Sequence, residues 1–153
     1  MGVEVSNESL PVLFEGAPSF VARLTAIPPA ERLDRAEVIA LTMPEPEQIE
    51  LLNAHPRIGA TASSVSDLSF REQGYDRDPG TAELQTRLDR LNAEYEQRFG
   101  FRFVVFVAGR PRAVIADVME AHLDADRDAE RERGLRDVVA IARDRAPKLA
   151  AAT

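Results

Sequence analysis

The longest regular pattern in the sequence is an apolar stripe with the spacing of an α-helix, between Thr81 and Gly100. Its members are separated by four, three, four and four residues, so they share one face of a helix. They are Leu84, Leu88, Leu91, Tyr95 and Phe99. Thr81 is suited to cap the start of this helix and Gly100 to end it. We expect the stripe to lie in the core of the protein.

Further helices are predicted on both sides of this one. They are expected near residues 19–27, 33–42, 46–54, 111–122 and 126–147, each bounded by proline or by a capping residue. In the helix 33–42 we expect Val38, Ile39 and Leu41 to be the buried residues. Pro147 is expected to kink or end the last helix.

Residues 101–107 form the most strand-like segment, and they have no convincing second strand to pair with. We therefore expect extended backbone packed between helices. Its N–H and C=O groups need hydrogen-bond partners, and a polar ligand is one candidate. The predicted fold is all-α: a single compact multi-helix domain over residues 1–153, ordered from about residue 10 to 149, with one extended non-sheet segment.

The charge balance excludes some classes of partner. With 19 basic and 26 acidic residues the net charge is −7, whereas nucleic-acid binding requires a basic face. The sequence has no cysteine, so it has neither disulfides nor thiolate metal ligands. The first twenty residues do not resemble a signal peptide, and no apolar run approaches the roughly 20 residues of a membrane span. We expect a cytoplasmic enzyme with no membrane partner.

His55 is the first candidate for chemistry, and it is followed by Pro56, Arg57, Ile58 and Gly59. Pro56 disfavours the helical conformation for His55, so a helix should end there. We expect the ring to lie outside the core, free to face a cleft. The negative end of the helix would favour its charged form. A plain capping or solvent-facing histidine is the alternative interpretation.

A second candidate segment follows at residues 69–73, where Glu72 could join His55 in an acid–base site for an anionic substrate. Because the protein as a whole is negative, local arginines would have to attract that substrate. The candidates are Arg57, Arg71, Arg102, Arg110 and Arg145. His55 and His122 lie in unrelated segments, so no metal site is predicted.

Five segments carry a resemblance to a known family. They are Leu13-Phe14-Glu15-Gly16-Ala17-Pro18, Ile49-x-Leu51-Leu52-x-Ala54-His55-Pro56-x-x-Gly59, Ser69-x-x-Glu72-Gln73, Leu91-Asn92-x-x-Tyr95-x-x-x-Phe99-Gly100-Phe101-x-Phe103 and Ile141-Ala142-x-x-Arg145. Together they resemble 2-oxo-4-hydroxy-4-carboxy-5-ureidoimidazoline (OHCU) decarboxylase, an enzyme of urate breakdown. The resemblance covers about residues 13–149.

This resemblance implies an all-α homodimer that converts its small anionic substrate to (S)-allantoin without a cofactor. His55 would be the acid–base residue, with Glu72 close to the reacting centre. The substrate-binding residues would be Pro56, Ser69, Gln73, the backbone of Phe103, Val104, Val105, Phe106 and Val107, and the side chain of Arg145. Two alternatives stay open: a catalytically silent helical interaction module, and a lyase or hydrolase acting on another small ureido anion.

Overall fold

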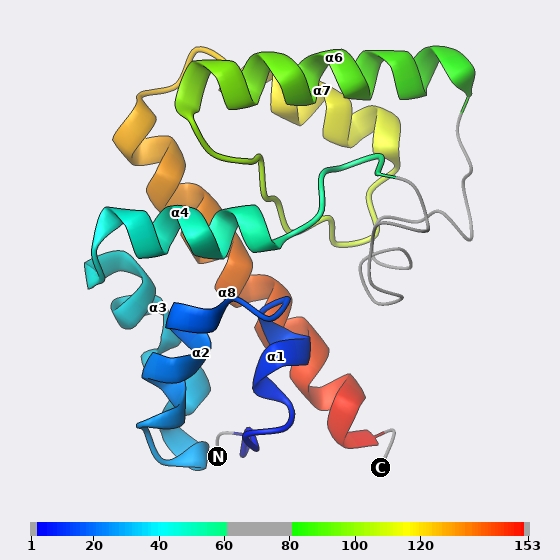
Figure 1. The fold of residues 1–153 in the computed structure, drawn as a ribbon. Helices are drawn as coiled ribbons and strands as arrows, with labels where there is room; N and C mark the ends of the chain where they lie inside the picture. Colours follow the sequence, from blue (N-terminus) through cyan, green and yellow to red (C-terminus); the bar gives the residue numbers. More distant parts are fainter. Residues whose placement is uncertain (1–2, 61–80, 152–153) are drawn as a thin grey trace. The chain divides into compact units, whose positions relative to one another are not determined.

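The computed structural model describes residues 3–60 and 81–151 (Figure 1). These residues are mostly helical and contain no strand, as the predicted all-α class requires. The chain divides into two compact units. The first combines Met1–His55 with Glu132–Thr153, and the second is Pro56–Arg131.

The first unit is built from helices at both ends of the chain. They are α1 (Leu10–Leu13), α2 (Pro18–Thr25), the 3₁₀ helix η1 (Pro29–Glu31), α3 (Arg32–Thr42), α4 (Glu45–Ala54) and the part of α8 (Arg127–Ala151) that follows Arg131. Helix α2 packs against α1, α3 and α4. The Glu50 carboxylate of α4 accepts a hydrogen bond of 2.8 Å from the Ser19 N–H, in the first turn of α2. This bond satisfies one of the N–H groups that a helix start leaves without a partner.

Helix α3 buries a different face from the predicted one. Val38 is 64% exposed and Ile39 is only half-buried, whereas Ala36 and Ala40 are fully buried. Arg32 lies on the same buried face, and its guanidinium donates to the carbonyls of Val5, Thr25 and Ile27. The prediction was wrong because it followed residue size. The small alanines and the backbone carbonyls that Arg32 satisfies determine which side of α3 faces inward.

Helix α8 supplies a buried row to the first unit: Leu135, Val138, Val139, Ala142 and Ala146. Gly134 allows close packing on α4, because a Cβ there would come within 3.0 Å of a Leu52 methyl group. The helix continues past Pro147 to Ala151, so Pro147 does not end it. The proline removes only the hydrogen bond to the carbonyl four residues earlier, which is tolerable near a helix end.

In the second unit, α6 (Ala82–Phe99) lies beside α7 (Arg112–His122) (Figure 1). The Thr81 side chain accepts a 3.1 Å hydrogen bond from the Leu84 N–H, and Gly100 ends α6 in the left-handed conformation. The stripe is buried from Leu88 onward, while Leu84 is half-buried. The caps and the core face of this helix are therefore confirmed.

An aromatic cluster attaches the extended segment to α6. The Tyr95 ring lies 4.6 Å from Phe99, 6.0 Å from Phe101 and 5.1 Å from Phe103, measured between centroids. Residues 102–107 have no regular secondary structure. This segment is therefore held by the packing of its apolar side chains on α6 and not by pairing in a sheet, as predicted from the lack of a second strand.

Candidate active site

His55 lies immediately after α4, with extended backbone at φ −81° and ψ 142°. Pro56 therefore ends the helix as predicted. The ring is buried, with only 3% of the residue exposed, so the expected position outside the core and the solvent-facing alternative are both wrong. Its Nδ1 lies 3.2 Å from the Leu51 carbonyl oxygen, which can only accept a hydrogen bond. Nδ1 must therefore carry a proton, and in the neutral ring Nε2 is the basic nitrogen.

Burial lowers the pKa of His55 from 6.5 to about 4. The Leu51 carbonyl and the Glu15 carboxylate raise this pKa, and the Arg145 cation lowers it. The expectation of a charged imidazole is wrong, because desolvation of the buried ring outweighs the partial charge of the helix end. At neutral pH the ring is uncharged and has one tautomer.

Arg145 is also buried, with 1% exposed, and lies on α8. One guanidinium nitrogen donates to the Glu15 carboxylate at 2.8 Å, and another donates to the Val12 carbonyl at 2.8 Å. Both partners belong to the end of α1 and the turn that follows it. Within the first unit, the structure thus brings together His55 and Arg145, and adds Glu15, to which the sequence analysis gave no role.

The loop after His55 is held by α6 within the second unit. The amide nitrogen of Asn92 donates to the Ile58 carbonyl at 2.8 Å, and that of Gln85 donates to the Gly59 carbonyl at 2.8 Å. Arg57 forms a two-bond ion pair with Glu96 at 2.6 and 2.8 Å. Pro56 is half-buried at the start of this loop.

The extended segment contains residues 103–107, whose backbone is predicted to bind the substrate. Phe103, Val104, Val105 and Val107 are buried, and Phe106 is half-buried. The guanidinium of Arg110 donates to the carbonyls of Phe106 at 2.7 Å and Val107 at 3.0 Å. Arg110 therefore has a structural role at the end of this segment. Ser69, Glu72 and Gln73, together with Arg71, lie outside the described residues.

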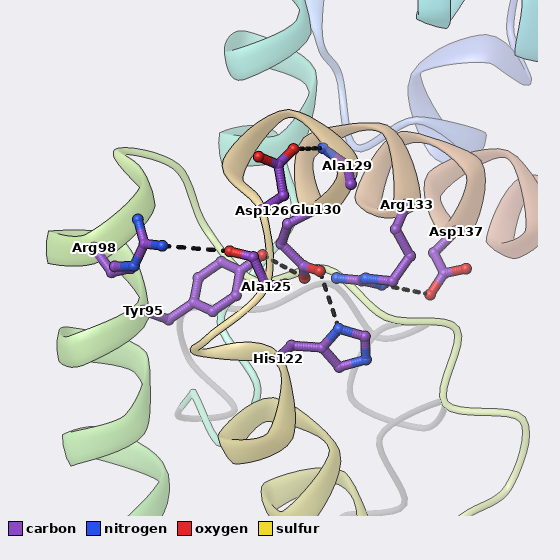
Figure 2. A network of polar contacts seen from close by, with 9 residues as sticks. All are labelled: Tyr95, Arg98, His122, Ala125, Asp126, Ala129, Glu130, Arg133 and Asp137. Carbon is purple, nitrogen blue, oxygen red and sulfur yellow. Dashed lines mark hydrogen bonds and ion pairs between the residues drawn. The ribbon is translucent and has the colours of Figure 1, made fainter.

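A second polar cluster lies in the second unit, and sequence reasoning missed it (Figure 2). Glu130 is buried, and its carboxylate accepts a bond of 2.7 Å from the Tyr95 hydroxyl and one of 3.0 Å from His122 Nδ1. The His122 side chain is 33% exposed. In the described part of the chain, no three His, Cys, Asp or Glu side chains gather as a metal site would require.

Comparison with families of known proteins matches residues 5–147 to OHCU decarboxylase. The chain belongs to the OHCU decarboxylase family. The five segments that carry the resemblance in the sequence all lie within this range. Glu15, His55 and Arg145 come from three of these segments, and Asn92 and Tyr95 come from a fourth.

Among relatives in this family, the chain is 29% identical over 151 residues to the uric acid degradation bifunctional protein PucL of Bacillus subtilis. It is 36% identical over 99 residues to the 2-oxo-4-hydroxy-4-carboxy-5-ureidoimidazoline decarboxylase of Halalkalicoccus jeotgali. These matches cover 94% and 63% of this chain. The chain spans only 30% and 54% of the length of the two relatives.

Solved structures show the same fold. A crystal structure of OHCU decarboxylase in the presence of (S)-allantoin matches with a TM-score of 0.78 at 23% identity, covering 96% of this chain and 99% of the other. A crystal structure of (S)-allantoin synthase matches with a TM-score of 0.65 at 18% identity, covering 93% of this chain and 48% of the other. No helix in the described residues is long and apolar enough to cross a membrane.

Proposed function

We propose that this chain decarboxylates OHCU to (S)-allantoin in urate breakdown. The observation that carries the proposal is His55, a buried neutral imidazole with one tautomer, located in a segment shared with the OHCU decarboxylase family. The curated relatives support the same reaction through their names, which include an OHCU decarboxylase and a uric acid degradation protein.

The chemistry needs no cofactor, because the substrate supplies its own electron sink. When the bond between C4 and the carboxylate breaks, CO₂ leaves and the electron pair enters the ring toward the adjacent C5=N bond. The ring nitrogen takes up a proton from solvent, which gives an enol at C4. Transfer of the C4 hydroxyl proton to C5 then produces the ketone of allantoin. Positioning the substrate and moving this proton are the tasks left to the protein.

His55 is proposed to perform the proton transfer. A neutral Nε2 can accept the C4 hydroxyl proton, as a general base does. The imidazolium that results is a strong acid, because burial disfavours its charge, so it can readily protonate C5. Stereospecific delivery to one face of C5 would give the (S) product.

The remaining site assignments are also proposals, and they rest on family membership. Glu72 would lie close to the reacting centre, Pro56 would line the site, and Ser69 and Gln73 would bind the substrate. The backbone of residues 103–107 would hydrogen-bond the ring. Arg145 would oppose the substrate's negative charge, in addition to its bonds to Glu15 and Val12.

An assay on freshly generated OHCU tests the reaction, with (S)-allantoin followed by its circular dichroism. His55→Asn should lower kcat by about 10²–10⁴, the usual effect of losing a general acid–base group. His122→Asn is the matched control, because it makes the same change at the only other histidine and should keep the wild-type rate. An inactive wild type would favour the silent-module alternative. A His55→Asn variant that keeps most of the rate would refute the assignment.

We also propose that the protein is cytoplasmic and, as the family resemblance implies, a homodimer. Light scattering at micromolar concentration should give a mass close to twice the 16.9 kDa of one chain. A mass of one chain would contradict this proposal.

A further inference from the structure

Glu15 has a backbone conformation that its residue type disfavours. Its φ is +52°, in the left-handed region, and the next residue, Gly16, follows at +72°. Glycine or asparagine would adopt such a conformation at lower cost than glutamate. Strained residues of this kind persist where surrounding contacts hold them, and they are common at functional sites.

An ion pair with Arg145 helps to hold Glu15 in this conformation. The side chains are 12% and 1% exposed, and the nitrogen–oxygen distance is 2.8 Å. The Val12 carbonyl accepts a second bond from the same guanidinium. Val12 and Glu15 lie on one short stretch of chain, so the left-handed turn lets a carbonyl and a carboxylate bind the same cation. The planar guanidinium is thereby held in one orientation.

We propose that Glu15 is a positioning residue for the decarboxylation: it orients the Arg145 guanidinium and balances its positive charge at His55. This inference rests on the proposed function of the site. Glu15 need not touch the substrate for this role. It acts through Arg145, which the family resemblance assigns to the substrate's charge, and through its field on His55.

The electrostatics around His55 support this role. Arg145 on α8 and Glu15 in the turn after α1 act on the imidazole with opposite signs. Removal of the Glu15 charge takes away one of the interactions that raise the pKa of His55, so this pKa should fall further. A purely structural ion pair elsewhere in the fold would have no such effect on the ring.

Glu15→Gln is the decisive variant, because it keeps the size of the side chain and removes its charge. Glu47→Gln is the matched control, since it removes the same charge from an ion pair with Arg23. We expect kcat/KM on OHCU to fall at least about tenfold in Glu15→Gln, since small misplacements in a site cost up to about 10²-fold. Glu47→Gln should stay within about twofold. Glu15→Asp keeps the charge but reaches less far, and its kcat/KM should lie between those of wild type and Glu15→Gln.

The second readout is the side-chain nitrogen NMR spectrum of the two histidines, which does not depend on turnover. Glu15→Gln should move the titration midpoint of His55 below its wild-type value. Unchanged kinetics together with an unchanged His55 titration would overturn the inference.

If wild type fails to turn over OHCU, the proposed function fails, and the titration alone decides the role of Glu15 at His55. If Glu15→Gln does not fold, Glu15→Asp decides: wild-type kcat and KM would overturn the inference, and reduced values with an unshifted His55 titration would support it.

Discussion

His55 combines a position at a helix end with nearly complete burial. The helix end supplies the backbone geometry, and the Leu51 carbonyl fixes the ring tautomer. Burial then keeps the ring neutral. Since a neutral imidazole can accept a proton and its buried conjugate acid readily returns it, one residue suffices for the proposed proton transfer.

The same burial makes stability depend on pH. Below about pH 6.5 the unfolded chain protonates His55, while the folded chain does not until about pH 4. The free energy of unfolding should therefore fall as the pH drops through this window, by roughly 3 kcal/mol from this group alone. Urea unfolding of wild type and His55→Gln between about pH 4.5 and 7.5 measures how the free energy of unfolding of each depends on pH. The wild-type curve should fall more steeply on acidification. Parallel curves would contradict the assignment.

His55 and Glu15 also show where residue-level prediction from sequence stops. The proline after His55 predicts the helix end correctly, because that rule concerns neighbouring residues. Burial of the ring depends on tertiary packing that the local sequence does not encode. The partner of Glu15 is 130 residues away, and nothing in the sequence marks residue 15 for a left-handed turn.

At the scale of elements, Gly59 sits where the loop after His55 meets α6. Its φ is +84°, and a Cβ would come within 3.0 Å of a Leu88 methyl group. Leu88 is fully buried and has little room to move. Gly59→Ala should therefore lower the free energy of unfolding by about 1–2 kcal/mol because of the left-handed conformation. The crowding should lower it by about 1–3 kcal/mol more.

Gly100→Ala separates these two costs. Gly100 has nearly the same φ, +82°, and a Cβ there would meet nothing within 4 Å. Gly100→Ala should therefore lose only the conformational part of this free energy. Urea unfolding of the two variants measures the difference in their free energies of unfolding. Equal losses would show that the contact with Leu88 does not matter.

The buried carboxylate of Glu130 joins α8 to α6 and α7 within the second unit (Figure 2). Tyr95→Phe removes one donor from this carboxylate and keeps the ring in the aromatic cluster. We expect the free energy of unfolding of Tyr95→Phe to fall by about 1.5–3 kcal/mol, the usual value for a hydrogen bond to a charged group. A double-mutant cycle with Glu130→Gln should show a coupling of at least about 1 kcal/mol. Additive losses would mean that the two residues act independently.

Elements were predicted best where the pattern is regular. Helix α6 was predicted from its apolar stripe and its two capping residues. The extended segment 101–107 was predicted from the lack of a second strand. Helix α3 was assigned the wrong face, because its inward side is formed by small alanines and an arginine. Hydrophobic size is a poor guide when close packing and satisfied carbonyls determine which side is buried.

At the scale of the whole molecule, the order of the chain constrains how it can fold. The first unit needs both ends of the chain, Met1–His55 and Glu132–Thr153, and the second unit lies between them in sequence. Within the first unit, Arg145 of α8 binds the turn after α1. The first unit therefore cannot form its buried ion pair until the last helix is present.

We accordingly predict that residues 1–153 unfold as one domain, in a single cooperative transition. Helix α8 supplies residues to both units, so loss of either unit removes packing partners from the same helix. Calorimetry should give a van't Hoff enthalpy equal to the calorimetric enthalpy. The tyrosine fluorescence, which comes from Tyr75 and Tyr95, and the NMR signal of His55 in the first unit should change at the same urea concentration. Two separate midpoints would show that the units are independent domains. Arg145→Leu, which removes the ion pair of the first unit, should then shift only one of these midpoints, whereas in a single domain it lowers the common one.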